Sequence, residues 1–421
     1  MAVAEALSFC LVSTFYPPFG FGGDGVHVQR LAGALAASGH RVRVVHAPQA
    51  YRLLGGEAAP VESVEHEGIE VVAVPAGRPA TIGTYLTGQP LGYGRQLAQL
   101  VEGFDVVHFH NPSLLGGPGA LRLGDGVRLY TTHEHWLVCP THVLFRNNRE
   151  ICTRRTCVSC TIRHHRPPQP WRATAMLERA VDHLDALLCP SRFTADLHRR
   201  HFPRARIEVL PLPVPLAEAI PTRPADPPMF LYAGRLEPIK GIDRLVAAFP
   251  AVRGADLVVA GDGSLAPALA EAARRNPRIR LVGRRTPAEV LELCRQAAAV
   301  VVPSAGYETF GGIAVEAMSV ATPVAVRALG PLPELVEEGG GVTFDSDESM
   351  VAVLQDLVDR PELRAALAAE ATEIAATRFS EGRFLARYFA IIAERAAAGG
   401  RHDIGRRARL AEASVAEEPG A

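Results

Sequence analysis

Two series of alternating strand-like and helix-like segments constrain the fold of this chain more than any other feature. In the first half, amphipathic stretches such as VHVQRLAGALAAS separate the apolar runs LSFCLVSTF, RVRVVHA, DVVHFH, RLYTTH and ALLCPS. The second half repeats the pattern with MFLYAGR, DLVVAGDG, IRLVGR and AVVVPS. Parallel strands need a crossover, usually a helix, to reach their neighbours. The order therefore predicts an α/β protein with two domains, each a parallel sheet covered by helices.

A proline-rich segment, 211–228, divides the two series and predicts a stiff linker. It separates an N-terminal domain, 1–210, from a C-terminal domain, 229–380. The spacing of apolar residues in 381–398 predicts an amphipathic helix that returns to the N-terminal domain. Segment 399–421 has little apolar surface, so we expect a disordered tail there.

The composition narrows the class of partner. The chain has 421 residues, 44 Lys plus Arg against 45 Asp plus Glu, and 48% hydrophobic residues. A net charge of -1 argues against nucleic acid or an anionic membrane as the main partner. No apolar run is long enough to span a membrane, and the first apolar run lacks a positive segment before it, so we expect a cytoplasmic protein. The composition does not specify the oligomeric state.

Lys240 is the only lysine among those 44 basic residues. It ends the motif Gly234-Arg235-Leu-Glu-Pro-Ile-Lys240, which follows a strand and precedes a helix. The fork of Arg235 and the compact ammonium of Lys240 suit the oxygens of a diphosphate. The alternative is two solvated cations near a turn, which is less attractive for a lysine in a chain that otherwise uses arginine.

A second motif places two carboxylates around a helix start. Glu308 and Glu316 are eight positions apart, with Gly311 and Gly312 between them opening a helix whose N–H groups can approach an anion. Either glutamate alone is explained by the favourable helix dipole. Both motifs together favour a ligand with hydroxyls on either side of a diphosphate, which is the layout of a nucleotide sugar.

On these motifs, residues 230–330 resemble the C-terminal domain of family 4 glycosyltransferases, with Glu308 and Glu316 as the E-x7-E signature. The organisation is similar over nearly the whole chain. The resemblance implies the GT-B fold, with two Rossmann-like domains facing a central cleft. It also implies transfer of a hexose from a GDP- or UDP-sugar with retained anomeric configuration, and no cofactor for catalysis.

The resemblance also implies roles for residues. Arg235 and Lys240 would stabilise the leaving diphosphate, Glu308 would bind sugar hydroxyls and Glu316 the ribose. His133, at the end of RLYTTH, matches the family's active-site histidine beside the donor sugar. The other positions that match donor-binding segments of the family are Gly22, Gly23, Gly234, Gly261, Asp262, Gly263, Val282, Gly283, Phe310, Gly311, Gly312 and Ile313.

One departure from the family pattern is the pair Val320-Ala321, where Cys-Gly or a similar pair is usual. A second candidate motif, Asp345-Ser-Asp347, has the form of a metal-binding DxD sequence. It lies in a late loop, so we interpret it as a turn.

Four cysteines are spaced C-x12-C-x4-C-x2-C in an insertion, 139–170, that follows His133: Cys139, Cys152, Cys157 and Cys160. The spacing favours structural zinc over another metal cluster or over unliganded or redox-active thiols. The other three cysteines, Cys10, Cys189 and Cys294, lie in strand or helix patterns and are predicted core residues.

Two other functions stay open at this point. A nucleotide-sugar epimerase can share the architecture, and the cysteine loop could belong to a metal- or redox-sensing protein with a vestigial transferase half. The acceptor is a small molecule or a glycan. Arginine in place of lysine and abundant alanine suggest a GC-rich bacterial genome, which favours a secondary metabolite somewhat over a cell-envelope glycan.

Overall fold

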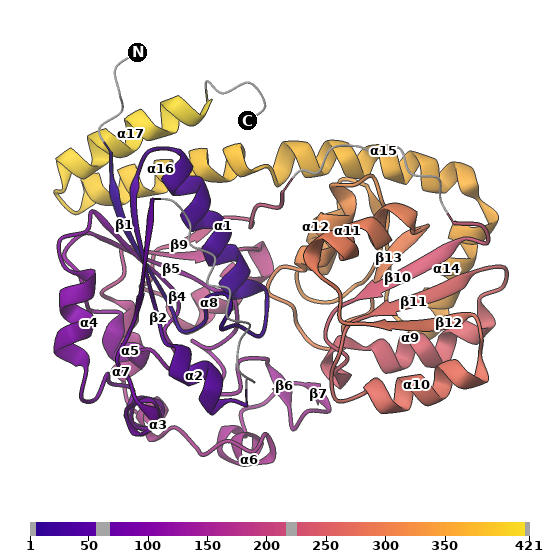
Figure 1. Ribbon diagram of the computed structural model, residues 1–421, viewed down its shortest axis with the longest axis horizontal. Coiled ribbons are helices and arrows are strands. Elements are labelled where there is room, and N and C mark those ends of the chain that lie inside the picture. The colour runs from indigo at the N-terminus through magenta and orange to yellow at the C-terminus, as the bar shows by residue number, and fades with distance from the viewer. Residues whose placement is uncertain (1–5, 56–67, 216–224, 417–421) are drawn as a thin grey trace. The chain divides into compact units, whose positions relative to one another are not determined.

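The structure is a computed structural model that describes residues 6–55, 68–215 and 225–416. The chain forms two compact units. Unit 1 comprises Met1–His142, His165–Pro211 and Glu381–Ala421, and unit 2 comprises Val143–His164 and Leu212–Ser380. Each unit contains a parallel sheet flanked by helices, which confirms the α/β prediction (Figure 1). Residues 216–224 of the predicted linker lie outside the described residues.

Unit 1 is built on a seven-stranded sheet in which every described strand pair is parallel. In spatial order the strands are β3 (Ile69–Ala73), β2 (Arg41–His46), β1 (Ser8–Ser13), β4 (Val106–Asn111), β5 (Val127–Thr131), β8 (Ala186–Cys189) and β9 (Ile207–Val209).

Period-two alternation along β1 supplies the cores on both faces of this sheet. Phe9 and Leu11 join one buried cluster, and Cys10 and Val12 join the other. The sequence of the strand is therefore a nearly continuous apolar run, as expected when both faces of the sheet are covered. The helices of unit 1 are α1 (Gly23–Ala37), α2 (Pro48–Leu53), α3 (Arg78–Thr87), α4 (Gly94–Val101), α5 (Gly117–Ala120), η1 (Pro170–Ala173), α7 (Met176–Val181), α8 (Arg192–His201), α16 (Glu381–Ala398) and α17 (His402–Ala416).

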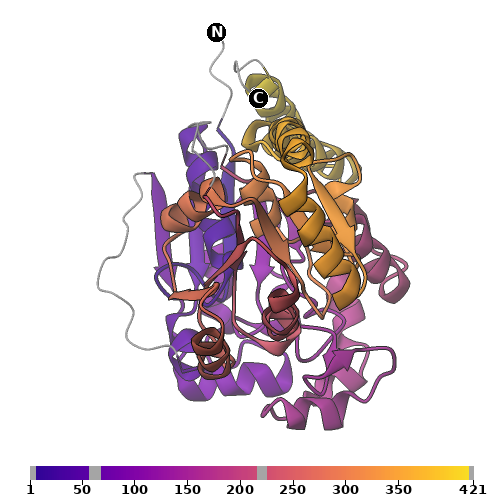
Figure 2. The ribbon, with the colours of Figure 1, turned by 90° about the vertical axis from the view of Figure 1, so that its right-hand side faces the viewer.

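The C-terminal segment differs from the prediction. Helix α16 packs on the sheet of unit 1, but 402–416 form the helix α17 where the sequence predicts a disordered tail. The two helices lie side by side in both views (Figures 1 and 2). The buried stripe of α17 is made of small side chains, Ala408, Ala411 and Val415, with Gly405 beside them. Such a stripe buries little apolar area per residue, so composition alone underestimates the helix.

Ion pairs dock α17 on the rest of unit 1. Arg407 donates to both oxygens of Asp105, at 2.6 and 3.0 Å, and to the carbonyl of Ala6. Arg401 reaches Asp185 at 2.6 Å. Burial raises the pKa of Asp105, but hydrogen bonds from Arg407 and Ser8 outweigh it and hold the pKa below its ordinary value of 3.8.

We predict that Arg407→Ala destabilises unit 1 by about 1–3 kcal/mol at neutral pH, since Asp105 loses a charge-assisted partner. The depressed pKa of Asp105 contributes stability above its unfolded pKa of about 3.9, and this is lost as the pH falls through the folded value. The difference in thermal midpoint between wild type and variant should therefore shrink on acidification. A difference that stays constant with pH would contradict the pairing. Arg406→Ala, one residue earlier on the exposed side, is the control.

Unit 2 is built on a six-stranded sheet, again parallel throughout. In spatial order the strands are β12 (Ile279–Gly283), β11 (Asp256–Ala260), β10 (Met229–Ala233), β13 (Ala299–Val302), β14 (Val324–Arg327) and β15 (Gly341–Phe344). Phe230 and Tyr232 of β10 face one core, and Met229 and Leu231 face the other.

Helices cover both faces of this second sheet (Figure 1). Ser346 caps one of them through a capping box with Ser349, which confirms that the Asp345-Ser-Asp347 sequence forms a turn at a helix start. The helices are η2 (Pro238–Lys240), α9 (Ile242–Ala248), η3 (Phe249–Ala251), α10 (Ala266–Arg275), α11 (Pro287–Gln296), α12 (Gly312–Met318), α13 (Leu332–Val336), α14 (Asp347–Asp359) and α15 (Pro361–Arg378).

Most of the cysteine insertion groups with unit 2, although its position in the sequence predicts that it belongs to the N-terminal domain. It forms a hairpin of β6 (Phe145–Arg146) and β7 (Glu150–Ile151), followed by α6 (Cys157–Arg163). Phe145 is 3% exposed, and its ring lies against Gly306, where a Cβ would be 3.3 Å from Cδ2. One buried aromatic ring thus fixes the hairpin to a loop distant in sequence, which spacing alone does not reveal.

The Val320-Ala321 departure has a conformational consequence. Ala321 follows α12 with φ of 61°, a left-handed conformation that costs a non-glycine residue about 1–2 kcal/mol. A glycine at this position would avoid that strain, but its greater conformational entropy in the unfolded chain would offset about 0.5–1 kcal/mol of the gain.

We therefore predict that Ala321→Gly stabilises unit 2 by about 0.5–1 kcal/mol in urea unfolding. The same substitution at Ala268, exposed within α10, should destabilise by about 1 kcal/mol. A loss of stability in Ala321→Gly would contradict the conformation.

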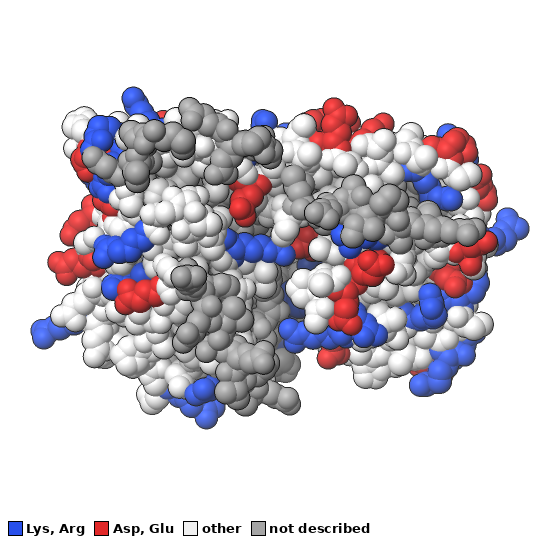
Figure 3. Space-filling model, turned by 45° about the horizontal axis from the view of Figure 1, so that its top comes forward, with Lys and Arg blue, Asp and Glu red and all other residues white. Residues whose placement is uncertain are grey.

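The surface carries no extended field of one charge on the face shown in Figure 3, where Lys and Arg are interspersed with Asp and Glu. This mixture agrees with the near-zero net charge. Among the described residues, none of the helices combines the length and apolar character needed to cross a lipid bilayer.

Candidate functional site

The two sequence motifs of unit 2 meet at the point where its strand order reverses. The chain runs outward from β10 through β11 to β12, and then returns to place β13 on the other side of β10. Ligands of open α/β sheets bind at the carboxyl ends of the strands at such a switch point. Arg235 and Lys240 follow β10, while Ser304 and Glu308 follow β13.

A charged pair joins these two loops. Lys240 Nζ donates to both carboxylate oxygens of Glu308, at 2.7 and 2.8 Å, and Ser304 Oγ donates to Oε1 at 2.6 Å. The side chains of Lys240 and Glu308 are 24% and 18% exposed. The backbone adds to the link, because the N–H groups of Ala305 and Gly306 donate to the carbonyl of Ile239.

The pair holds Glu308 ionised. Burial raises the pKa of this carboxyl group, but the charge of Lys240 and hydrogen bonds from Lys240 and Ser304 outweigh it, so the net pKa is below its ordinary value of 4.5. At neutral pH the site therefore presents a carboxylate beside an ammonium group, with a partly exposed surface that a ligand can reach.

Glycines allow the loops to approach one another closely. Gly261 has φ of 145°, and a Cβ there would lie 1.9 Å from the carbonyl oxygen of Gly234. Gly241 has φ of 65°, and its Cβ would lie 2.1 Å from the carbonyl oxygen of Pro303. Both contacts are to backbone, so no side chain can move aside. Part of the glycine pattern assigned to donor binding thus has a packing role.

The remaining predicted residues of unit 2 lie around the same strand ends. Arg235 is exposed, and its carbonyl accepts a hydrogen bond of 2.6 Å from Tyr232. Helix α12 begins at Gly312 after Gly311, with φ of 98°, and carries Glu316 in its second turn. Phe310 is buried against Phe379, which makes it a core residue as well. The others are partly or fully exposed at the ends of β11 and β12 or at the start of α12: Asp262, Gly263, Val282, Gly283 and Ile313.

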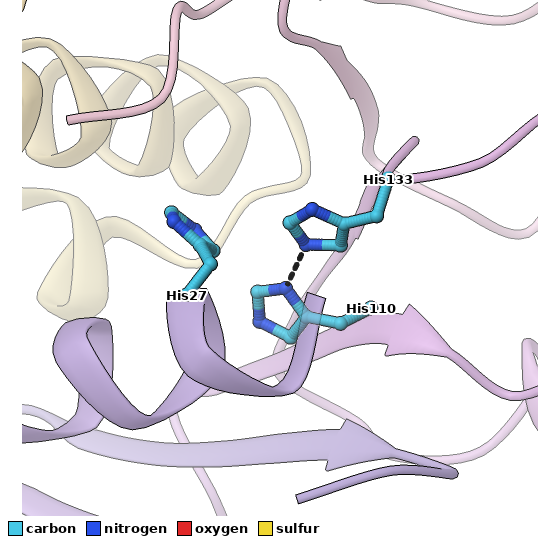
Figure 4. Close-up of side chains that lie close together, drawn as sticks. All are labelled: His27, His110 and His133. Carbon is cyan, nitrogen blue, oxygen red and sulfur yellow. Dashed lines mark hydrogen bonds between the residues drawn. The ribbon is translucent and has the colours of Figure 1, made fainter. Parts of the chain in front are cut away.

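Unit 1 carries its own cluster at the corresponding switch point, between β1 and β4. Three histidines converge there: His27 of α1, His110 near the end of β4, and His133 just after β5 (Figure 4). His110 Nδ1 and His133 Nε2 share a hydrogen bond of 2.9 Å. A fourth imidazole, that of His108, lies against His110 with the ring centroids 3.9 Å apart and the ring planes tilted by 37°.

Burial keeps these imidazoles neutral. It lowers the pKa of His133 from 6.5 to about 3, with His108 adding to the effect. It also lowers the pKa of His27 and of His110 well below the ordinary value. At neutral pH His133 is therefore a hydrogen-bonding or ligating group and not a cation.

The predicted glycine loop precedes this cluster. Gly22 caps α1 in an extended conformation and α1 begins at Gly23. Four residues later the same helix presents His27, so the loop and the cluster are part of one local structure.

The four cysteines of the insertion are divided between the units. Cys139 belongs to unit 1 and hydrogen-bonds Thr141 at 3.2 Å, whereas the other three belong to unit 2. Cys160 Sγ accepts the N–H of Asn147 at 3.3 Å. Within the described ranges, ligand atoms of three histidines cluster, whereas those of Cys152, Cys157 and Cys160 do not form such a group. Zinc in this loop stays a prediction. Cys10, Cys189 and Cys294 are buried thiols whose pKa burial raises to about 12, which confirms them as core residues.

Sequence reasoning missed four residues beside these clusters. Ser304, His27, His110 and Phe145 lie next to residues that it singled out. Two had a readable signal, because His110 ends a buried strand and His27 follows the glycine pair by four positions. Ser304 and Phe145 depend on contacts between distant segments.

Family models match most of the chain. Residues 21–218 match the model described as Glycosyltransferase Family 4, and residues 216–374 match the model described as Glycosyl transferases group 1. Among curated proteins, the chain is 28% identical over 383 residues to glycogen synthase of Mycobacterium tuberculosis, covering 83% of this chain and 86% of that one. It is 30% identical over 385 residues to D-inositol 3-phosphate glycosyltransferase of Xylanimonas cellulosilytica, with the same coverage.

Solved structures share the fold. Sucrose-phosphate synthase from Thermosynechococcus elongatus superposes with a TM-score of 0.72 at 19% identity, covering 93% of this chain and 100% of that one. HepE from Anabaena, in complex with UDP, gives 0.65 at 17% identity, covering 92% and 100%. The two α/β units and these likenesses define a glycosyltransferase of the GT-B fold. With 30% identity across most of a curated relative, the chain belongs to family 4 of the glycosyltransferases.

Proposed function

We propose that this glycosyltransferase moves a hexose from a GDP- or UDP-sugar to a small-molecule or glycan acceptor, with retained anomeric configuration and without a catalytic metal. The acceptor is a secondary metabolite or a cell-envelope glycan. A nucleoside diphosphate donor agrees with the UDP bound in the structure of HepE.

The observation that carries this proposal is the Lys240–Glu308 pair at the switch point of unit 2, held by Ser304. A donor diphosphate would replace Glu308 as the hydrogen-bond partner of the Lys240 ammonium group. Arg235, which is exposed after β10, would bind the same phosphates. Both cations would then stabilise the negative charge that develops on the leaving diphosphate. Glu308, kept ionised by its surroundings, would accept hydrogen bonds from sugar hydroxyls, and Glu316 from the ribose.

We assign a further role to His133 of unit 1. Its lowered pKa makes it neutral at physiological pH, so it would contact the donor sugar as a hydrogen-bonding group without adding a charge.

The test is a panel of nucleotide sugars and nucleoside diphosphates in a thermal-shift assay with a chelator present. A correct donor at 100 times its dissociation constant should add about 2.7 kcal/mol of apparent stability. The stabilising donor is then incubated alone with the enzyme, and the products are separated. Slow release of free sugar with the donor's anomeric configuration, and of nucleoside diphosphate, is expected.

Two outcomes would overturn the proposal. If no GDP- or UDP-sugar stabilises the protein, these nucleotide sugars are excluded as donors. Conversion of the donor into an isomeric nucleotide sugar, without release of diphosphate, would make the enzyme an epimerase of the same architecture.

A further inference from the structure

We propose that the three histidines at the switch point of unit 1, His27, His110 and His133, form a binding site for a divalent transition-metal ion. This site is separate from the cysteine loop. It goes beyond the proposed function, in which His133 alone has a role and no metal takes part.

The geometry is that of an incomplete tetrahedral site. One ring nitrogen from each histidine lies within 4.8 Å of the others. Three imidazoles bound to zinc at 2.0–2.1 Å would have nitrogens about 3.3 Å apart. Small rotations of the three side chains would therefore close the site. Because they come from α1, β4 and the second residue after β5, the backbone that carries them is fixed by the sheet (Figure 4).

Unsatisfied nitrogens support a ligand here. The Nε2 atoms of His27 and His110 are buried and lack a hydrogen-bond partner among the described residues. His27 is 5% exposed and His110 is fully buried. A buried polar atom without a partner is destabilising, and two in one cluster of imidazoles call for a physical explanation. Coordination of an ion supplies one.

The ligand chemistry selects the class of ion. Neutral imidazoles suit Zn²⁺, Co²⁺, Ni²⁺ or Cu²⁺ and do not suit the hard cations Mg²⁺ and Ca²⁺. His133 is only partly buried, which leaves a side by which the ion can enter and a fourth position for water.

Occupation of this site would affect catalysis, a consequence that rests on the proposed function. An ion bound to His133 would take the ring nitrogen that otherwise contacts the donor sugar. The site would therefore be inhibitory, unlike the metal sites that activate other transferases. Metal binding itself does not depend on turnover, so failure of the metal site is distinguishable from failure of the proposed transferase function.

The test is Co²⁺ titration of the full chain, produced without a histidine tag, followed by visible absorption. All proteins carry Cys152→Ser and Cys157→Ser so that the cysteine loop does not bind the ion. We expect one Co²⁺ per chain, with the intense d–d bands of four- or five-fold coordination. His27→Gln and His133→Gln should each raise the dissociation constant for Co²⁺ at least about 100-fold, since substitutions of residues that only support the ligands already lower metal affinity about 10- to 100-fold. The control is His198→Gln, another buried histidine of unit 1 with an unsatisfied Nε2, and it should bind like the parent.

Absence of d–d absorption in the double-serine protein would overturn the proposal, including the case in which the wild type alone binds the ion. Equal binding by His133→Gln and the parent would also overturn it. If circular dichroism shows that His27→Gln does not fold, His133→Gln decides the question, because its side chain is partly exposed and its loss disturbs the core least.

Discussion

Lys240→Ala is expected to weaken the binding of a nucleoside diphosphate sugar by about 10- to 150-fold. A hydrogen bond to a charged group contributes about 1.5–3 kcal/mol, and every 1.4 kcal/mol is a factor of ten in affinity. Calorimetric titration of the donor found in the thermal-shift panel measures the effect. The chain should stay folded, since Glu308 keeps its hydrogen bond from Ser304 and can take up a proton.

Two controls separate this effect from general loss of charge. Arg244→Ala removes a cation from α9 that is 49% exposed and 4.0 Å from Asp347, a surface pair of little energetic value, and should leave donor affinity unchanged. Lys240→Arg keeps the charge but replaces a compact ammonium with a planar fork, so it should restore only part of the affinity. Unchanged affinity in a folded Lys240→Ala protein would refute the assignment of the diphosphate to this lysine.

The same variant should change how stability depends on pH. In the wild type the depressed pKa of Glu308 contributes stability above its unfolded pKa, which is lost as the pH falls through the folded value. Without Lys240 the largest lowering influence is gone, and burial favours the protonated form. The stability gap between wild type and variant should therefore widen from about pH 4 to about pH 7.

Gly261→Ala is expected to destabilise unit 2 by more than about 4 kcal/mol and to lower its thermal midpoint by about 10 °C or more. The added Cβ would lie 1.9 Å from the carbonyl oxygen of Gly234, so the ends of β10 and β11 would have to separate. Donor binding should be lost with the local structure. Differential scanning calorimetry with far-ultraviolet circular dichroism measures both.

Gly283→Ala is the matched comparison, because it also ends a strand and has positive φ, 71°, but no atom lies within 4 Å of its Cβ position. It should cost only the strain of the left-handed conformation, about 1–2 kcal/mol. Equal effects of the two substitutions would mean that conformation alone, and not the close backbone approach, makes Gly261 necessary.

Much of the fold follows from periodicity in the sequence. The runs around Phe9 and Phe230 are apolar on both faces, which is the pattern of a parallel sheet covered on both sides, and both are interior strands of such sheets. Lys240 and Glu308 are 68 positions apart, yet each follows a strand, and the carboxyl ends of parallel strands meet at one edge. Because Lys240 is the only lysine of the chain, the composition also favours a functional role for this residue.

The features that the sequence does not reveal depend on small areas or on distant contacts. Helix α17 is held by alanines and by Arg407 reaching Asp105, 302 positions away, so neither hydropathy nor local charge pattern predicts it. Phe145 fixes the cysteine hairpin against Gly306, which only the folded chain brings near. His27 and His110 join His133 because the strands β4 and β5 end, and the helix α1 begins, at the same sheet edge.

The central claim, that a donor diphosphate binds at Lys240, has a direct test because no other lysine is present. Amine-directed acylation followed by peptide mass spectrometry can report only Lys240 and the chain's amino terminus. We expect a saturating nucleotide sugar, chosen from the thermal-shift panel, to slow acylation of Lys240 and to leave that of the amino terminus unchanged. Acylation of Lys240 at the same rate with and without a stabilising nucleotide sugar would contradict it.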